Sequence, residues 1–183
     1  MRKIVLVFGL IAGAILSVIM LLTIPFKDQI GYDHGAVIGY TSMVLAFLLV
    51  YFGVRSYRDN IAGGTIGFGR ALGVGALIAL IASACYVATW EVLYHTVASD
   101  YLTSYEAHAL EKARASGESP AAIAAKKAEL DKYAELYKNP AFNIAFTFLE
   151  PLPVALIFVL VSAGVLSRRR RVVGGGGAEP AIS

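Results

Sequence analysis

The chain has 183 residues and a mean hydropathy of +0.66, with 57% hydrophobic and only 16% charged residues. That composition leaves too little polar surface for a water-soluble globule of this length and indicates one compact membrane domain. The net charge of +3 does not indicate a nucleic-acid partner, because four of the sixteen lysines and arginines stand beside an apolar segment, where anionic lipid headgroups are the expected partner: Arg168, Arg169, Arg170 and Arg171.

Four nearly charge-free runs follow one another, each near the ~20 residues that a helix needs to cross a bilayer. We expect an all-α, polytopic membrane protein with transmembrane helices over residues 4–26, 35–54, 71–93 and 143–167, in a domain of residues 1–171. The first run is not expected to be a cleaved signal peptide, because residues 17–25 offer no small-x-small cleavage site. Residues 172–183, with four consecutive glycines, are expected to form a disordered cytoplasmic tail.

Small residues in the first and third runs indicate close helix contacts, because helices in lipid associate by close approach of their backbones. They recur four residues apart as Gly9, Gly13 and Ser17, as Gly69 and Gly73, and as Ala71, Gly75, Ala79 and Ser83. Packing within the monomer and homodimerisation both remain open as the reason for these patterns.

Basic residues in the short segments beside the runs predict the orientation, since such segments stay in the cytoplasm. The amino terminus, residues 55–70 and the carboxyl end hold nine lysines and arginines, whereas the first connection holds only Lys27. The long third connection balances six basic residues with seven acids. Both termini are therefore expected on the cytoplasmic side.

The second connection, residues 55–70, combines arginines with glycines. Arg55 and Asp59 stand four residues apart and are expected to pair. Arg55, Arg58 and Arg70 join the four carboxyl-terminal arginines as candidate lipid-headgroup contacts. Lipid anchoring would account for this connection, and a re-entrant or gating segment is the alternative.

The third connection, residues 96–140, carries clear helix signals. Ser119 before Pro120 is typical of an N-cap with proline at the first helical position, and residues 139–140 (Asn-Pro) indicate a stop. A shorter helix is expected over residues 100–115, ended by Gly117. The pair predicts an extracytoplasmic helical hairpin, which serves either as a cap on the helix ends or as a docking surface.

Glu150 is the only formal charge between Ala141 and Ser167. An acid inside the hydrocarbon is costly, so Glu150 is expected to be paired or functional. Asn143 and Thr147 share its helix face, and the two prolines that follow free backbone carbonyls nearby. Together with two residues at the outer end of the third run, they form the candidate intramembrane polar site: Glu150, Thr147, Asn143, Glu91 and His95.

Three roles remain open for Glu150. It either locks helices through a hydrogen bond or an ion pair with Lys27, His34 or His95, or handles ions or protons, or takes part in catalysis. Freed carbonyls beside a carboxylate are consistent with a cation or proton site.

The sharper catalytic motifs are incomplete. Residues 64–69 have the glycine spacing of a phosphate loop, but Arg70 and Ala71 stand where Lys and then Ser or Thr are required. The three histidines stand in no zinc motif, and Cys85 is the only cysteine, which excludes an intrachain disulfide. We therefore predict no enzyme activity, no cofactor and no metal site.

Several short stretches are weak one by one but specific in their order. They are residues 57–60 (Tyr-Arg-Asp-Asn), 63–71, 86–90, 137–140, 147–150, 153–156 and 161–166. Over about residues 5–170 they resemble the bacterial membrane family catalogued as domain of unknown function 4199. The resemblance implies a four-helix protein with an extracytoplasmic insertion, in a bacterial inner membrane, without assigned activity. The chain departs from the family pattern at residue 155, where the expected small residue is often glycine and this sequence has Ala155.

The combined prediction is an integral inner-membrane protein of unassigned function, a structural or accessory component that acts by helix packing and partner docking. Its expected partners are membrane lipids with anionic headgroups and either a second copy or another membrane protein. The alternative is a small oligomeric ion- or proton-coupled transporter that uses Glu150.

Overall fold

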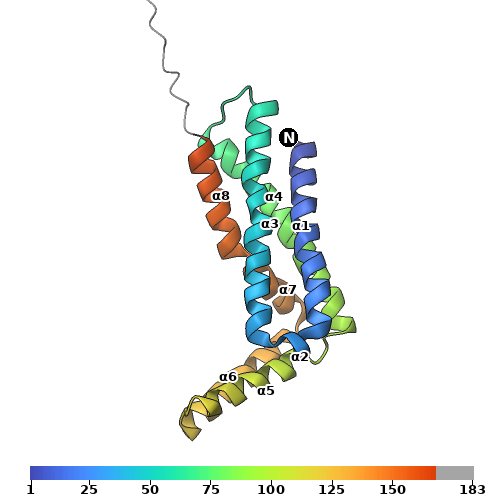
Figure 1. The fold of residues 1–183 in the computed structure, drawn as a ribbon, viewed down its shortest axis with the longest axis vertical. Helices are drawn as coiled ribbons and strands as arrows, with labels where there is room; N and C mark the ends of the chain where they lie inside the picture. Colours follow the sequence, from blue (N-terminus) through green and yellow to red (C-terminus); the bar gives the residue numbers. More distant parts are fainter. Residues whose placement is uncertain (168–183) are drawn as a thin grey trace, which may run out of the picture.

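The computed structural model describes residues 1–167. Within that range the protein is all-α, and three helices are long and apolar enough to cross a membrane (Figure 1). A bent pair near the end of the range makes a fourth span if its two helices are counted together. A multi-pass membrane protein is therefore confirmed at this level.

The first three spans are longer than the charge-free runs. α1 (Arg2–Thr23) continues through a short 3-10 turn η1 (Ile24–Phe26) into α2 (Lys27–Ile30). α3 (Tyr32–Asn60) and α4 (Phe68–Thr96) have 29 residues each. Because the polar ends of α3 and α4 remain helical, the connection expected over residues 55–70 is only residues 61–67.

The fourth span, expected as one helix over residues 143–167, is broken. α7 (Pro140–Leu149) and α8 (Leu152–Leu166) meet at an angle of 41°. Pro151 and Pro153 have no backbone N–H to donate to the preceding turn, so the hydrogen-bond ladder stops at this point. α8 then packs against α3 and α4, whereas α7 packs mainly against α4 and α6.

Glycines set the closest contact in the bundle, between α1 and α4. A Cβ atom on Gly9 would lie 2.8 Å from Cβ of Ile81, and one on Gly13 would lie 2.6 Å from Cβ of Cys85. These distances are too short for any side chain. The predicted role of Gly9 and Gly13 in close packing is confirmed, and the contact lies within one chain.

Gly69 and Gly73 do not pack in this way, which corrects the expectation for the start of the third span. A Cβ atom on either glycine would meet nothing within 4 Å. Ala71 and Gly75, two residues further along, are buried. Two residues correspond to more than half a turn of an α-helix, so the two sets face opposite sides and only one reaches the core.

The polar insertion folds into two helices, α5 (Tyr101–Ala115) and α6 (Pro120–Tyr137), which we call the hairpin. Ser119 Oγ accepts a hydrogen bond of 3.2 Å from the backbone N–H of Ala122, as expected for the N-cap. Gly117 takes a φ of +76°, which only glycine adopts without strain. Asn139 Oδ1 accepts from the N–H of Ala141, so the expected stop also begins α7.

Two ion pairs hold the hairpin against the end of the bundle where α1 ends and α3 begins (Figure 1). Lys27 Nζ lies 3.1 Å from Asp100, and Lys112 Nζ lies 2.8 Å from Asp33. The hydrogen bond from Lys27 lowers the pKa of Asp100, which keeps that carboxylate ionised at neutral pH. The start of α1, the end of α8 and residues 61–67 lie at the opposite end of the bundle.

The α1–α4 contact generates a first prediction. Gly13→Ala should lower the free energy of unfolding by about 1–3 kcal/mol, because its new methyl group overlaps Cys85 and forces the helices apart. Gly73→Ala is the matched control and should leave stability unchanged or slightly raised, since open space surrounds that glycine. Thermal unfolding in detergent measures both, and equal effects of the two variants would contradict the packing.

Candidate functional site

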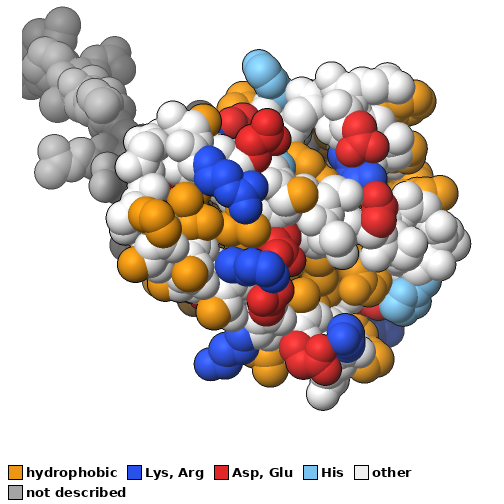
Figure 2. Space-filling view, turned by 90° about the horizontal axis from the view of Figure 1, so that it is seen from below, with side chains coloured by type: hydrophobic (Ala, Val, Ile, Leu, Met, Phe, Trp, Pro, Cys, Tyr) orange, Lys and Arg blue, Asp and Glu red, His pale blue; other side chains and the backbone are white. Residues whose placement is uncertain are grey.

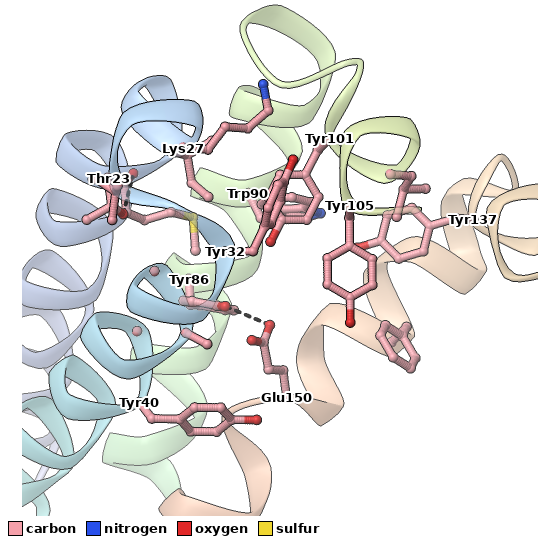
Figure 3. Close-up of a pocket in the computed structure, with 18 of the residues that line it drawn as sticks. Thr23, Lys27, Tyr32, Tyr40, Tyr86, Trp90, Tyr101, Tyr105, Tyr137 and Glu150 are labelled. Atoms are coloured by element: carbon pink, nitrogen blue, oxygen red, sulfur yellow. Dashed lines mark hydrogen bonds between the residues drawn. The ribbon is translucent and has the colours of Figure 1, made fainter. Parts of the chain in front are cut away.

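A cavity of about 530 Å³ lies between the hairpin and the adjoining ends of the membrane-spanning helices (Figure 3). The first turns of α3 line it on one side, and Phe146 of α7 and Glu150 at the bend of the broken span line it on another. α1, α3, α4, α5, α6 and α7 all contribute side chains to its wall. We call this cavity the aromatic groove.

The lining of the aromatic groove combines an apolar wall with aromatic side chains. Leu16, Ile19 and Met20 of α1 form the apolar wall. Aromatic residues from five other helices line the rest: Tyr32, Tyr40, Tyr86, Trp90, Tyr101, Tyr105, Tyr133, Tyr137 and Phe146. The charged lining residues are three acids and one lysine: Glu106, Glu129, Glu150 and Lys27.

Glu150 lies at the junction of α7 and α8 and faces the groove. Its Oε2 accepts a hydrogen bond of 2.7 Å from the Tyr86 hydroxyl on α4 (Figure 3). The side chain therefore joins the break in the last span to the neighbouring helix, across 64 residues of sequence.

The expected ion pairs of Glu150 were wrong. Lys27 lies 3.1 Å from Asp100 and 3.7 Å from Asp28, and His95 lies beside Glu91. Between residues 1 and 167, no Lys, Arg or His lies within ion-pair distance of Glu150. Lys27 pairs with Asp28 and Asp100, so Glu150 has the Tyr86 hydroxyl as its partner instead of a cation.

Asn143 and Thr147 belong to a separate, buried network. Asn143 is 1% exposed and Thr147 is 3% exposed. Asn143 Oδ1 accepts from Trp90 Nε1 and from Thr147 Oγ1, each at 3.2 Å. The Tyr137 hydroxyl lies 3.1 Å from Thr147 Oγ1. This network joins α4, α6 and α7, so the two residues of the predicted stripe fix the helices that form the groove.

Glu91 and His95 do not join Glu150 in one site. His95 Nε2 lies 3.8 Å from Glu91 Oε2, and neither residue lines the aromatic groove. Glu91 Oε1 is buried without a hydrogen-bond partner in the described range. Within residues 1–167, no three His, Cys, Asp or Glu side chains gather as metal ligands would.

The arginines of the second connection lie at helix ends. Arg55 Nε is 3.6 Å and Arg58 Nε is 2.7 Å from the Asp59 carboxylate, so the expected pairing of Arg55 occurs and Arg58 shares the same acid. Arg70 is exposed on the first turn of α4. The other candidate lipid contacts, Arg168 to Arg171, and the tail of residues 172–183 lie outside the described residues.

Aromatic side chains of the hairpin are the part of the site that sequence reasoning missed. Tyr101 packs edge-on against Trp90, with ring centroids 5.1 Å apart, and Tyr32 lies 5.6 Å from both Tyr101 and Tyr105. Burial raises the pKa of Tyr101 to about 12, so its hydroxyl stays neutral at physiological pH. Tyrosines spaced along two polar helices were the available signal, but the sequence does not say that they face the membrane helices.

In chemical terms, the site offers aromatic surface, an apolar wall and two carboxylates, Glu129 and Glu150, that are in no ion pair within the described range. Those features suit the binding of an apolar or positively charged group.

Comparison with known proteins gives one result. Residues 7–168 match the family model described as Protein of unknown function (DUF4199). No curated protein and no solved structure matches the chain.

The buried network generates a second prediction. Asn143→Leu should lower the free energy of unfolding by about 1–3 kcal/mol, because it leaves the Trp90 N–H and Thr147 hydroxyl without their acceptor. Thermal unfolding, followed by the emission of Trp90, the only tryptophan, measures the loss. Asn60→Leu is the control, since Asn60 is exposed and bonds only to Ser56 of its own helix. Equal stability of both variants would show that the network contributes nothing.

Proposed function

The chain belongs to the DUF4199 family of proteins of unknown function, and from that premise we propose that it is a non-enzymatic accessory protein of a bacterial inner membrane. It acts by holding four spans together and by presenting the hairpin to a partner outside the membrane. Anionic lipid headgroups at the opposite end of the bundle complete its interactions.

The attachment of the hairpin is the observation that carries this proposal. Two ion pairs and the tyrosines of α5 fix the hairpin to the bundle, while most of α6 is exposed. Figure 2 looks onto this end of the molecule and shows Lys and Arg side chains alternating with Asp and Glu. A fixed, water-facing surface of mixed charge suits contact with a protein rather than insertion into lipid.

The distribution of basic residues supports an orientation in which the hairpin is extracytoplasmic and both termini are cytoplasmic. Arg55, Arg58 and Arg70 lie at the end of the bundle that carries the start of α1 and the end of α8. Positively charged short segments stay in the cytoplasm, and there they lie against anionic headgroups.

The shape of the core favours an accessory role over transport. The aromatic groove is confined to the hairpin end, because the opposite half of the bundle is filled by completely buried side chains: Phe47, Val50, Val54, Val74 and Ile78. A single copy of the chain therefore offers no continuous path across the membrane within the described residues.

The orientation gives a third prediction. In a Cys85→Ala background, which has no other cysteine, Ser116→Cys at the tip of the hairpin should react with a membrane-impermeant maleimide added to intact bacterial cells. Thr65→Cys, in the α3–α4 connection, should react only after the membrane is opened. Both positions are exposed, so each serves as the control for the other. The reverse pattern would contradict the orientation.

Docking through the hairpin gives a fourth prediction. A photo-cross-linking amino acid in place of Arg114 or Lys132, both exposed on the hairpin, should join the chain to the same second protein in intact cells. The same amino acid in place of Val161, which is 55% exposed on α8, should not form that product. Mass spectrometry of the products measures this. The absence of a shared product from both hairpin positions would contradict docking, and so would products with a second copy alone.

A further inference from the structure

The aromatic groove has chemistry that the accessory role does not use. We infer that it binds a free lipophilic organic cation, a compact apolar molecule with one delocalised or quaternary positive charge. The charge lies beside Glu150 among aromatic rings, and the apolar body lies against α1. This inference does not depend on whether the hairpin docks a partner.

The space and the apolar wall of the groove fit a molecule of that kind. About 530 Å³ is within the range of pockets that hold small organic ligands. Leu16, Ile19 and Met20 of α1 form an apolar surface along one wall. Polar groups are concentrated on the other walls, so an amphiphilic ligand has one favoured direction.

The charge of the lining selects a cation. Lys127 lies 3.0 Å from Glu106, and Lys27 is held by Asp100, so these two lining charges already have partners. Glu129 and Glu150 are in no ion pair within residues 1–167, and Glu150 has only the Tyr86 hydroxyl as its partner. A carboxylate in surroundings of low dielectric is unfavourable without a counter-charge, and a bound cation supplies one.

Aromatic rings make the site specific for an organic cation over a metal ion. Figure 3 shows Tyr40, Tyr86 and Tyr105 around Glu150, with Tyr32, Tyr101 and Trp90 above them. Cations with diffuse charge bind to aromatic faces, and such cages recognise quaternary ammonium groups. A small metal ion would need several oxygen ligands, and within residues 1–167 no three His, Cys, Asp or Glu side chains gather to supply them.

The depth of Glu150 favours a free cation over the amine of a phospholipid. α7 has 10 residues, so its far end lies about 15 Å from its start at the hairpin. A phospholipid amine is held at the headgroup layer by its acyl chains, whereas a free cation can enter to this depth.

Tetraphenylphosphonium is the probe, and tetraphenylborate, an anion of nearly the same shape, is its control. Purified protein in dodecyl maltoside micelles, which contain no ammonium, is titrated by equilibrium dialysis while the emission of Trp90 is recorded. One saturable phosphonium site per chain, with a change in Trp90 emission, is the expected result. Saturable binding of both ions, or of neither, would overturn the inference.

Glu150→Gln should weaken phosphonium binding at least tenfold, because it keeps the size of the side chain and removes its charge. Glu111→Gln is the matched control: this acid is exposed on the hairpin and does not line the groove, so binding should be unchanged. Equal affinity of the two variants would overturn the role of Glu150. Thermal unfolding of each variant confirms that it is folded.

A second pair of variants tests the aromatic walls without touching the acid. Tyr40 is 53% exposed, so Tyr40→Leu should fold normally and weaken binding several-fold by removing a ring. Phe52→Leu, at a residue that is 48% exposed and outside the groove, should have no effect. Loss of phosphonium binding on adding phosphatidylethanolamine would identify a lipid amine as the occupant and overturn the free cation.

Discussion

The break in the last span is the feature on which the rest of this molecule depends. Proline cannot donate a backbone hydrogen bond, and two prolines within three residues end α7 and redirect the chain by 41°. α8 then lies with α3 and α4 as an ordinary member of the bundle. α7 packs against α4 and α6 instead, and Phe146 of α7 and Glu150 at the bend line the aromatic groove.

A bend alone would leave α7 free to move, and the buried network holds it in place. Asn143 is the shared acceptor for a group from α4 and a group from α7, while Tyr137 extends the network into the hairpin. Polar side chains that bond across helices act as glue in lipid, where water cannot replace the lost partner. The network therefore ties the hairpin and the broken span to α4 beside the groove.

The sequence predicted features that depend on neighbouring residues and missed those that depend on distant ones. The apolar runs predicted the membrane spans, and the Ser119–Pro120 pair predicted the start of α6. The spacing of Gly9 and Gly13 predicted a close contact between helices. The same spacing at Gly69 and Gly73 was misleading, because periodicity defines a face without saying what lies opposite it. The bond between Tyr86 and Glu150 spans 64 residues, so only the assembled bundle reveals it.

The lengths of α3 and α4 bear on the membrane that suits this protein. A helix of 29 residues measures about 44 Å, whereas the hydrocarbon core of a typical bilayer is about 30 Å thick. The surplus lets each helix keep its charged ends in water without thinning the bilayer around it. A helix longer than the hydrocarbon core fits a thinner membrane by modest tilting, so the hydrophobic mismatch there costs little. The lengths of α3 and α4 therefore make the bundle tolerant of bilayers that are thinner than average.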